Sequence, residues 1–560
     1  MTKKIRMPSS LSVIFFASLF CAGLFNEYFS CLVSIALAVW LAVNHIKKKE
    51  TVFYSNLSSW SVVIIVLSYG ICSLWAVDTG VAILGFFKYL PVLFFLICLM
   101  QTEDREKILS LLPYVAGVMV IISSVFTFIP FDFFQKYFVV AGRLAGFFQY
   151  PNTFALFVLV AELLLVSKNK LKIADLVTVA VLLAGIVYTG SRTVFILAFL
   201  SNRAVIMLTK GKKARLCFLG VVALMAVGVG LYFIISGGLG VFGRFADISL
   251  KESTFVGRIL YVVDALPEVL KHPFGMGYLG YYFTQGSFQT GVYTVTTAHN
   301  DLVQIMLDVG WIPGIAFVAV VIKAVLSEKN SLARKIILIT VFLHCLFDFN
   351  LQFVSMFFVI ILFLDYDTGK KKTIKKHTKG VCVTMGILAV LSLYFGVALF
   401  VSWLGYNDVA ERIYPYNTTN SLVLLQKEED KEKAYILAED ILERNEYAYL
   451  ANSVKARYLY SKGDFANLIE CKDHIIEIAP FTPNEYEEYA QMLSRGIMLY
   501  SQAGDMYSVE VCTDKIIYVK EMVDNIEDKL SPLGKLIKDQ PEVWLSDDMR
   551  EYIEELEAAK

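Results

Sequence analysis

Charged residues are scarce in this sequence, and neither sign is in excess. Lys, Arg, Asp and Glu make up 18% of the 560 residues, and the 51 basic residues are balanced by 51 acidic ones. Soluble domains contain roughly 25% charged residues, so a single soluble enzyme is excluded. A nucleic-acid-binding protein would need its basic residues gathered on one folded face, and here they are scattered between apolar runs. With 57% hydrophobic residues, the composition indicates a membrane protein.

Patterns typical of metal sites and disulfide frameworks are also lacking. The nine cysteines form no CxxC pair and no Cys/His ligand spacing, and seven of them lie in apolar runs, where cysteine behaves as a small hydrophobic residue. We therefore expect no metal, no cofactor and no disulfide framework. The basic N-terminus precedes an apolar run without a convincing cleavage site, so this run is predicted to be a retained first span.

The balanced charge conceals two regions of opposite character. Residues 1–403 are apolar and hold 34 Lys/Arg against 19 Asp/Glu, whereas residues 404–560 are polar and hold 17 against 32. Two domains of different kinds are therefore predicted, a membrane domain at 1–403 and a polar domain at 404–560.

Thirteen apolar runs in the first region are candidates to cross a bilayer as helices. They lie near residues 9–25, 28–44, 59–76, 80–100, 107–129, 151–167, 172–189, 193–209, 215–235, 300–326, 336–349, 351–366 and 380–403. Basic residues concentrate in alternate loops, which the positive-inside rule places in the cytoplasm together with the N-terminus. The odd count then puts the long segment at about 236–298, and all of 404–560, outside. The two short runs beside Asn350 could instead form one re-entrant hairpin.

The C-terminal region carries a helical repeat. Residues 430–442 align with residues 464–476 at a spacing of 34, the period of tetratricopeptide helix pairs. About three degenerate repeats would form a curved α-solenoid. The predicted fold class is therefore all-α: a polytopic membrane helical bundle of about 13 transmembrane helices, followed by a C-terminal α-solenoid.

Three arginines stand out because the chain keeps most of its basic residues in the loops predicted to be inside. Arg143 precedes a span, Arg192 occupies an outer turn between two spans, and Arg258 lies in the long outer segment. A guanidinium presents a fork of donors suited to a phosphate or a carboxylate. Each arginine alone is equally well explained by lipid headgroups, but three on one face favour an anion site.

The strongest local signal is the run TTAHNDLVQ at residues 296–304. His299 is predicted to open a span there, with a hydroxyl residue available as the N-cap. Because the first turn of a helix disfavours a cationic imidazole, we expect His299 to be neutral and able to act as a general base. The alternative is an interfacial histidine that only hydrogen-bonds the turn. His344 and Asp348, at i and i+4 on one predicted helical face, either support this site or merely satisfy each other.

The outer segment also contains a glycine motif and many aromatic residues. Residues 275–280 match GxGxxG, but no strand precedes them, so a dinucleotide site is not expected. The aromatic residues could stack on sugar rings, although ordinary interfacial belts have the same composition. The acidic triplet at 365–367 resembles a motif for metal-bound nucleotide sugars, yet it lies on the predicted inner side.

Taken together, these residues resemble the O-antigen ligase and polymerase family of bacterial membrane proteins. The resemblance covers roughly residues 1–366 and rests on GRLAGFFQYPN, TGSR, GR, PFGMGY and HNDLVQIMLDVG, in this order and on the outer side. It implies a metal-independent glycosyltransferase of the cytoplasmic (inner) membrane, acting at its outer face on a glycan carried by undecaprenyl pyrophosphate. By this resemblance Arg143, Arg192 and Arg258 hold the pyrophosphate, and His299 is the base.

The expected partners are this lipid-linked glycan, an acceptor glycan, lipid or protein, membrane lipids, and an envelope protein on the repeat domain; no nucleic acid is expected. Two other functions stay open. One is a polymerase that joins lipid-linked repeat units, and the other is a transporter or sensor whose repeat domain binds peptide. A transporter would be expected to show internal symmetry, and residues 1–403 contain no convincing repeat. The thirteenth span and the repeat domain depart from the family pattern and leave the acceptor open.

Overall fold

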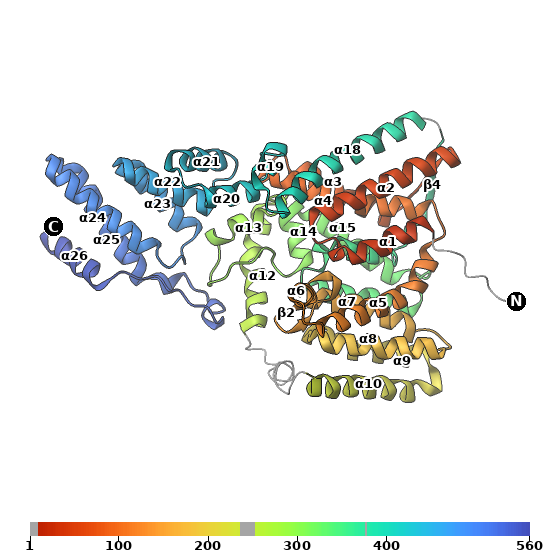
Figure 1. The fold of residues 1–560 in the computed structure, drawn as a ribbon. Helices are drawn as coiled ribbons and strands as arrows, with labels where there is room; N and C mark the ends of the chain where they lie inside the picture. Colours follow the sequence, from red (N-terminus) through yellow and green to blue (C-terminus); the bar gives the residue numbers. More distant parts are fainter. Residues whose placement is uncertain (1–8, 236–252, 376–377) are drawn as a thin grey trace.

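The computed structural model describes residues 9–235, 253–375 and 378–560. Within these residues the chain is helical, apart from two small two-stranded antiparallel sheets. A bundle of helices forms one part of the molecule, and an arm of helices extends from one end of it (Figure 1). The all-helical prediction holds except for these sheets. The basic N-terminus and residues 236–252 of the predicted outer segment lie outside the described residues.

The helices of the bundle follow the predicted apolar runs. They are α1 (Ser10–Phe20), α2 (Glu27–Lys48), α3 (Leu57–Cys72), α4 (Thr79–Met100), α5 (Arg105–Thr127), α7 (Pro151–Val166), α8 (Ile173–Thr189), α9 (Arg192–Thr209), α10 (Ala214–Ile235), α15 (Trp311–Leu326), α16 (Leu332–Cys345), α17 (Val354–Ile361) and α18 (Thr378–Trp403). Among the described residues, α2, α4, α5, α9 and α18 are long and apolar enough to cross a membrane, and six shorter apolar helices accompany them. The chain is an integral membrane protein, while the count of thirteen crossings stays a prediction.

Two ionisable side chains buried in the bundle, Lys88 and Glu162, have polar partners. Lys88 in α4 donates to Glu27 at 3.2 Å and to the hydroxyl of Tyr278 at 2.9 Å. Glu162 in α7 instead accepts a hydrogen bond from the Asn202 amide at 3.0 Å. A charge buried among apolar helices is costly unless it is paired, so these contacts explain how α4 and α7 tolerate ionisable residues in the core.

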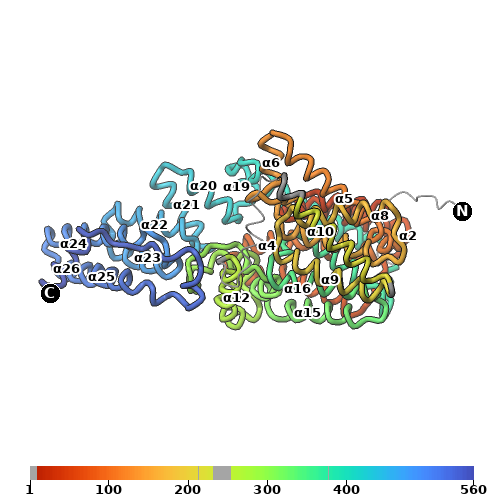
Figure 2. Tube along the Cα trace, turned by 90° about the horizontal axis from the view of Figure 1, so that it is seen from below, coloured from red at the N-terminus to blue at the C-terminus, as the bar shows by residue number. Residues whose placement is uncertain are grey.

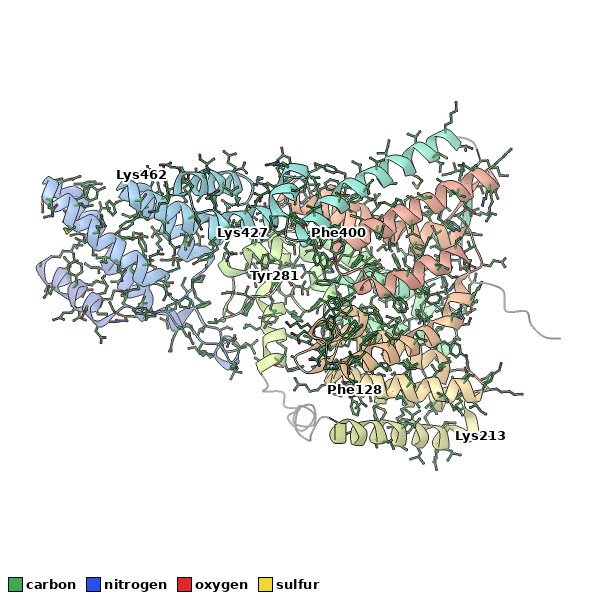
Figure 3. The ribbon with its side chains drawn as sticks, viewed as in Figure 1. Phe128, Lys213, Tyr281, Phe400, Lys427 and Lys462 are labelled. Carbon is green, nitrogen blue, oxygen red and sulfur yellow. The ribbon has the colours of Figure 1, made fainter. Side chains whose placement is uncertain are left out.

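The loops predicted to be inside gather at one end of the bundle. Strand β1 (Thr51–Ser55) pairs in antiparallel fashion with β4 (Lys370–Ile374), although more than 300 residues separate them. Next to this sheet, Lys48 donates to the carbonyl of Gln101 at 2.7 Å. Figure 3 shows Lys213, another residue of a predicted inner loop, at this end.

The segments predicted to be outside gather at the opposite end, where Figure 3 shows Phe128. They form α6 (Asp132–Phe138), the sheet of β2 (Val139–Val140) and β3 (Arg143–Leu144), α12 (Ser253–Lys271) and α13 (Gly280–Thr284). Helix α14 (Asp301–Val309), the first part of the predicted span at 300–326, packs against α12 and α13 at this end. The loops predicted to be inside and those predicted to be outside therefore lie at opposite ends of the bundle.

The predicted span at 300–326 is wrong, because the helix breaks at Gly310. This glycine has φ of 92°, and it separates α14 from α15. A Cβ at Gly310 would lie 2.4 Å from the carbonyl oxygen of Pro273, so only glycine fits where the outer segment crosses the chain. The two short helices around Asn350 run to the outer-segment end and back, since the carbonyl of Leu362 accepts from Arg105 near the opposite end at 2.8 Å.

The arm follows α18 and consists of helices that pack on their neighbours in sequence (Figures 1 and 2). These helices are α19 (Asn407–Ile413), α20 (Thr418–Lys427), α21 (Lys431–Arg444), α22 (Tyr449–Lys462), α23 (Phe465–Ile478), α24 (Glu485–Ala503), α25 (Met506–Asp524) and α26 (Asp547–Ala559). Asp430, Asp464 and Asp505 are the N-caps of α21, α23 and α25, each accepting from a backbone N–H of the first turn. The sequence repeat therefore marks equivalent helix starts, while the tetratricopeptide class stays a prediction.

The arm is docked on the outer-segment end of the bundle. The Tyr414 hydroxyl donates to the carbonyl of Gly80 at the start of α4 at 2.8 Å. The hydroxyls of Thr290 and Ser531 share a hydrogen bond of 2.8 Å. The arm therefore borders the segment that carries His299.

Candidate functional site

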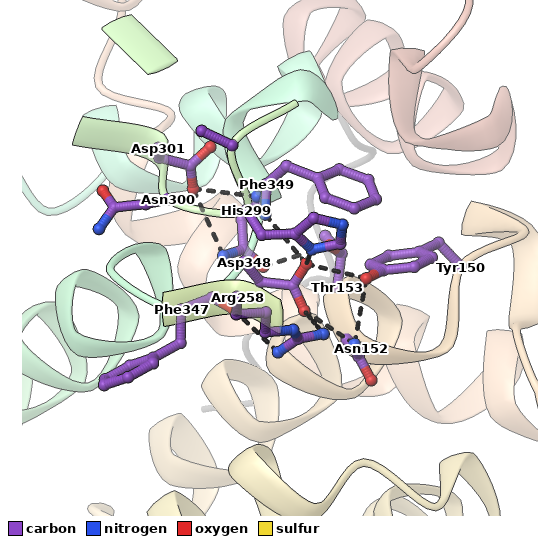
Figure 4. A network of polar contacts seen from close by, with 12 residues as sticks. Tyr150, Asn152, Thr153, Arg258, His299, Asn300, Asp301, Phe347, Asp348 and Phe349 are labelled. Carbon is purple, nitrogen blue, oxygen red and sulfur yellow. Dashed lines mark hydrogen bonds and ion pairs between the residues drawn. The ribbon is translucent and has the colours of Figure 1, made fainter. Parts of the chain in front are cut away.

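A buried carboxylate, Asp348, organises the site in the turn between α16 and α17. Its Oδ1 accepts from the Tyr150 hydroxyl at 2.8 Å and from the backbone N–H of Phe349 at 3.0 Å. Its Oδ2 accepts from the Asn152 amide at 2.8 Å and from the Arg258 guanidinium at 3.2 Å (Figure 4). A carboxylate with no exposed surface requires such partners, and here they come from α7, α12 and the turn itself.

His299 lies beside this carboxylate. Its Nδ1 is 3.5 Å from Asp348 Oδ1, and its side chain stays 20% exposed while that of Asp348 is fully buried. The imidazole packs edge-on against the Phe349 ring at 4.8 Å, and the Tyr261 ring is 5.8 Å away. His299 is therefore held between two aromatic rings, with one nitrogen directed at a carboxylate.

The backbone of His299 is strained. Its φ of 51° lies in the left-handed region, which costs a residue other than glycine about 1–3 kcal/mol. The predicted helix start is also wrong, because His299 precedes α14 and the N-cap is Asn300, whose side chain accepts from the N–H groups of Leu302 and Val303. No hydroxyl residue fills this role, and His299 is outside the first turn. Its orientation depends on Asp348 and on the strained backbone.

Arg258 and Arg143 both reach the Asp348 cluster. Arg258 donates from Nη1 to the Phe347 carbonyl at 2.8 Å, in addition to its ion pair with Asp348. Burial is the largest single influence and lowers the pKa of this guanidinium, but the Asp348 carboxylate, together with Tyr150 and Tyr261, outweighs it, so the pKa of Arg258 is raised. Arg143 donates to Asn152 Oδ1 at 2.5 Å, and Asn152 in turn donates to Asp348. Asn152 therefore links Arg143 to the Asp348 carboxylate, which in turn pairs with Arg258.

Arg192 lies near this cluster, because the TGSR turn to which it belongs contacts Arg143. It is the first residue of α9 and is half-buried. Three residues earlier, the Thr189 carbonyl accepts from Nε of Arg143 at 2.7 Å. The TGSR turn therefore contacts Arg143 directly, and all three predicted arginines lie at the same end of the bundle.

The predicted relation between His344 and Asp348 is wrong. Helix α16 ends at Cys345, so the two residues do not share a helical face. His344 is buried, and its Nδ1 lies 3.0 Å from Asn350 Oδ1 instead. Asn350 is held by Asp301, which accepts from its backbone N–H at 2.9 Å. His344 therefore supports, through Asn350, the turn that carries Asp348.

Sequence reasoning missed four polar residues of this network. Tyr150 and Asn152 contact Asp348, while Asp301 and Asn350 fix the turn. Tyr150 and Asn152 belong to the GRLAGFFQYPN motif together with Arg143, so the motif itself was the available signal. No local pattern marks the partnership of Asp301 with Asn350, because 49 residues separate them.

The arrangement can bind an anion and remove a proton. The cluster brings the guanidinium groups of Arg143 and Arg258, which attract anions, together with the imidazole of His299. Nδ1 of His299 lies 3.5 Å from Asp348 Oδ1 without a hydrogen bond among the described residues. A proton on Nδ1 would face this carboxylate and leave Nε2 as an acceptor. Catalytic hydrogen bonds are often long before a substrate binds and tighten in the complex.

Fold and site together define an integral membrane protein with a histidine and arginines around one buried carboxylate at one end of its helical bundle. Residues 177–319 match a family model described as O-antigen ligase. The matched segment runs from α8 into α15 and contains Arg192, Arg258 and His299. No curated protein matches the chain. The match supports the O-antigen ligase family and, broadly, a membrane glycosyltransferase of the ligase or polymerase type in polysaccharide biosynthesis.

Proposed function

We propose that this protein transfers a glycan from undecaprenyl pyrophosphate to an acceptor hydroxyl at the outer face of the cytoplasmic membrane. The observation that carries the proposal is the Asp348 network, which brings His299 and Arg258 together and joins Arg143 to them through Asn152. The family match over residues 177–319 supports the same reaction class. On this proposal the outer-segment end of the bundle and the arm are extracytoplasmic.

In the proposed reaction, His299 is the general base. Its Nε2 takes the proton of the acceptor hydroxyl while the hydroxyl oxygen attacks the anomeric carbon of the donor glycan. A new C–O bond forms, the bond from that carbon to the phosphate oxygen breaks, and undecaprenyl pyrophosphate leaves with the electron pair. Asp348 orients the imidazole and stabilises the imidazolium that forms.

The arginines act on the leaving group. Negative charge grows on the pyrophosphate as its bond to the sugar breaks, and fixed cations stabilise that charge without reorganising. A guanidinium meets two phosphate oxygens at once, which suits Arg143, Arg192 and Arg258 to this role. Because Asp348 holds Arg258 in place before the donor binds, part of the site is preorganised.

A polymerase would use the same chemistry with a different acceptor. Its acceptor would be a second lipid-linked glycan, whereas a ligase transfers the glycan to another envelope molecule. The arm, docked on the outer segment that carries His299, favours the ligase, because it adds a second surface at this end of the bundle for an acceptor of a different kind.

The test is the fate of the lipid-linked glycan in cells that lack this protein. We expect the undecaprenyl-linked pool to grow, and wild-type protein, but not His299→Asn, to restore its normal level. The sizes of the glycans in that pool separate the two reactions: full-length chains accumulate when a ligase is lost, and single repeat units when a polymerase is lost. An unchanged pool would contradict the proposal.

A further inference from the structure

A cavity of about 780 Å³ lies between the outer segment and the arm. Residues 282–294 form one wall, and α20 with the loops after α21 and α23 forms the other. The two walls are in direct contact, since a Cβ on Gly286 would lie 1.9 Å from the carbonyl oxygen of Ile478. The volume falls within the range of about 300–1,000 Å³ typical of small-molecule sites. The cavity is therefore formed before any ligand binds.

The lining of this cavity is aromatic and almost free of charge. Tyr282, Tyr293 and Tyr447 contribute rings, and Gln289 and Gln426 contribute amides from opposite walls. Among the described residues that line it, one is charged, an aspartate, and none is Lys, Arg or His. A pyrophosphate would need cations, so it is unsuited to this cavity. Amides and hydroxyls that both donate and accept, set among flat rings, suit the hydroxyls and C–H faces of neutral sugars.

Aromatic rings connect the cavity to the candidate base. The Tyr293 ring, which lines the cavity, is 4.6 Å from the Tyr261 ring. Tyr261 in turn lies 5.8 Å from the imidazole of His299. A glycan chain seated in the cavity thus borders the aromatic residues that contact the base.

We propose that this cavity is a carbohydrate site that binds neutral sugar units of the acceptor glycan. The assignment to the acceptor rests on the proposed function, since the base must meet an acceptor hydroxyl. The arm supplies half of the site. The glycan therefore enters between the arm and the membrane domain, while the donor is held at the arginines.

The test measures binding by the full-length protein in lipid nanodiscs, with no transfer required. The probes are labelled oligosaccharides from the envelope polysaccharide of the same cells and, separately, the oligosaccharide released by mild acid from the lipid-linked donor. The variants are Tyr447→Ala, Gln289→Ala and Gln426→Ala, the last at an exposed position of α20. The matched controls are Tyr507→Ala and Gln502→Ala on exposed surfaces of the arm.

We expect the envelope oligosaccharides to bind, each cavity variant to weaken their binding at least tenfold, and both controls to bind normally. Normal binding by all three cavity variants would overturn the proposal, as would preferential binding of the donor oligosaccharide or displacement of the probe by peptides alone. His299→Asn separates the two proposals, because it should bind the probe normally. Normal probe binding without any transfer by the wild-type protein would leave the cavity a carbohydrate site but contradict the proposed function.

Discussion

The bundle and the arm each contain a buried ionic cluster, one around Asp348 and one around Lys472. Lys472 is 1% exposed and donates to Glu485 at 2.6 Å and to Glu488 at 2.9 Å. Glu485 also accepts from Tyr449 at 2.5 Å, and Glu488 from Arg457 at 2.9 Å. Two cations therefore face two carboxylates, and the charges balance within the arm.

In the Asp348 cluster, by contrast, not every polar group has a partner among the described residues. His299 is partly exposed with a strained backbone. Nε of Arg258 is buried without a hydrogen-bond partner among the described residues. A saturated cluster is typical of structural stabilisation, whereas strain and unused donors are typical of a ligand-binding site.

Replacement of His299 should have the largest effect. His299→Asn keeps a residue that tolerates the left-handed backbone but removes the base, so transfer should fall about a hundred- to ten-thousand-fold. His299→Ala and His299→Gln should behave alike. The measurement is the rate of transfer from lipid-linked donor by purified protein. His344→Ala is the comparison and should be milder; if it abolished transfer while the His299 variants stayed active, the base would be misassigned.

Lys472→Met should damage stability without touching the chemistry. Removing one partner of a buried ion pair leaves uncompensated carboxylates and costs about 3–5 kcal/mol, so the arm should unfold at a lower denaturant concentration. Transfer per folded molecule should stay normal. Lys462→Met, which breaks the exposed pair with Glu432, is the control and should leave the midpoint unchanged. A loss of transfer in the folded Lys472 variant would remove the distinction between the two clusters.

Arg192→Lys should weaken donor use although it keeps the charge. An ammonium cannot reproduce a two-point phosphate contact, and hydrogen bonds to charged groups contribute about 1.5–3 kcal/mol. We expect the KM for the lipid-linked donor to rise about ten- to hundred-fold. Arg203→Lys, in the same helix, is the matched control. Full activity of both Arg192→Lys and Arg192→Ala would remove Arg192 from the site.

Gly80→Ala should loosen the arm from the bundle. A Cβ at Gly80 would lie 1.9 Å from the carbonyl oxygen of Tyr416, so the arm must shift. We expect a few-fold rise in the KM for the acceptor with unchanged donor binding. Gly386→Ala in α18 is the control, because its Cβ would meet open space. An equal loss of donor binding would mean that the docked arm supports the whole site.

A reporter fused after Lys560 should leave transfer unchanged and lie outside the cytoplasmic membrane, whereas one near Lys372 should lie inside. The basis is the gathering of the predicted inner loops at the end of the bundle that carries β4, away from the arm. Protease accessibility in intact cells measures both positions. A cytoplasmic C-terminus would contradict the sidedness and, with it, the carbohydrate site on the arm.

The sequence predicted more of the fold than of the site geometry. Helices follow the apolar runs because hydropathy is a local property, and the repeat of residues 430–442 at 464–476 corresponds to α21 and α23 because helical periodicity is local as well. The prediction of one continuous helix failed at Gly310, where a close approach of Pro273 breaks an otherwise apolar run. It also failed at His344, whose predicted helix ends before Asp348.

The sequence by itself determined that this is a helical membrane protein with arginines and a histidine on one side, since composition, hydropathy and charge distribution suffice for that. Only the tertiary structure decided that Asp348 is the centre of the site. Its partners Tyr150, Asn152 and Arg258 lie 90 to 198 residues away in the chain. Only the packing of α7, α12 and the α16–α17 turn brings them together, and the same long-range packing places the arm against the outer segment to form the cavity.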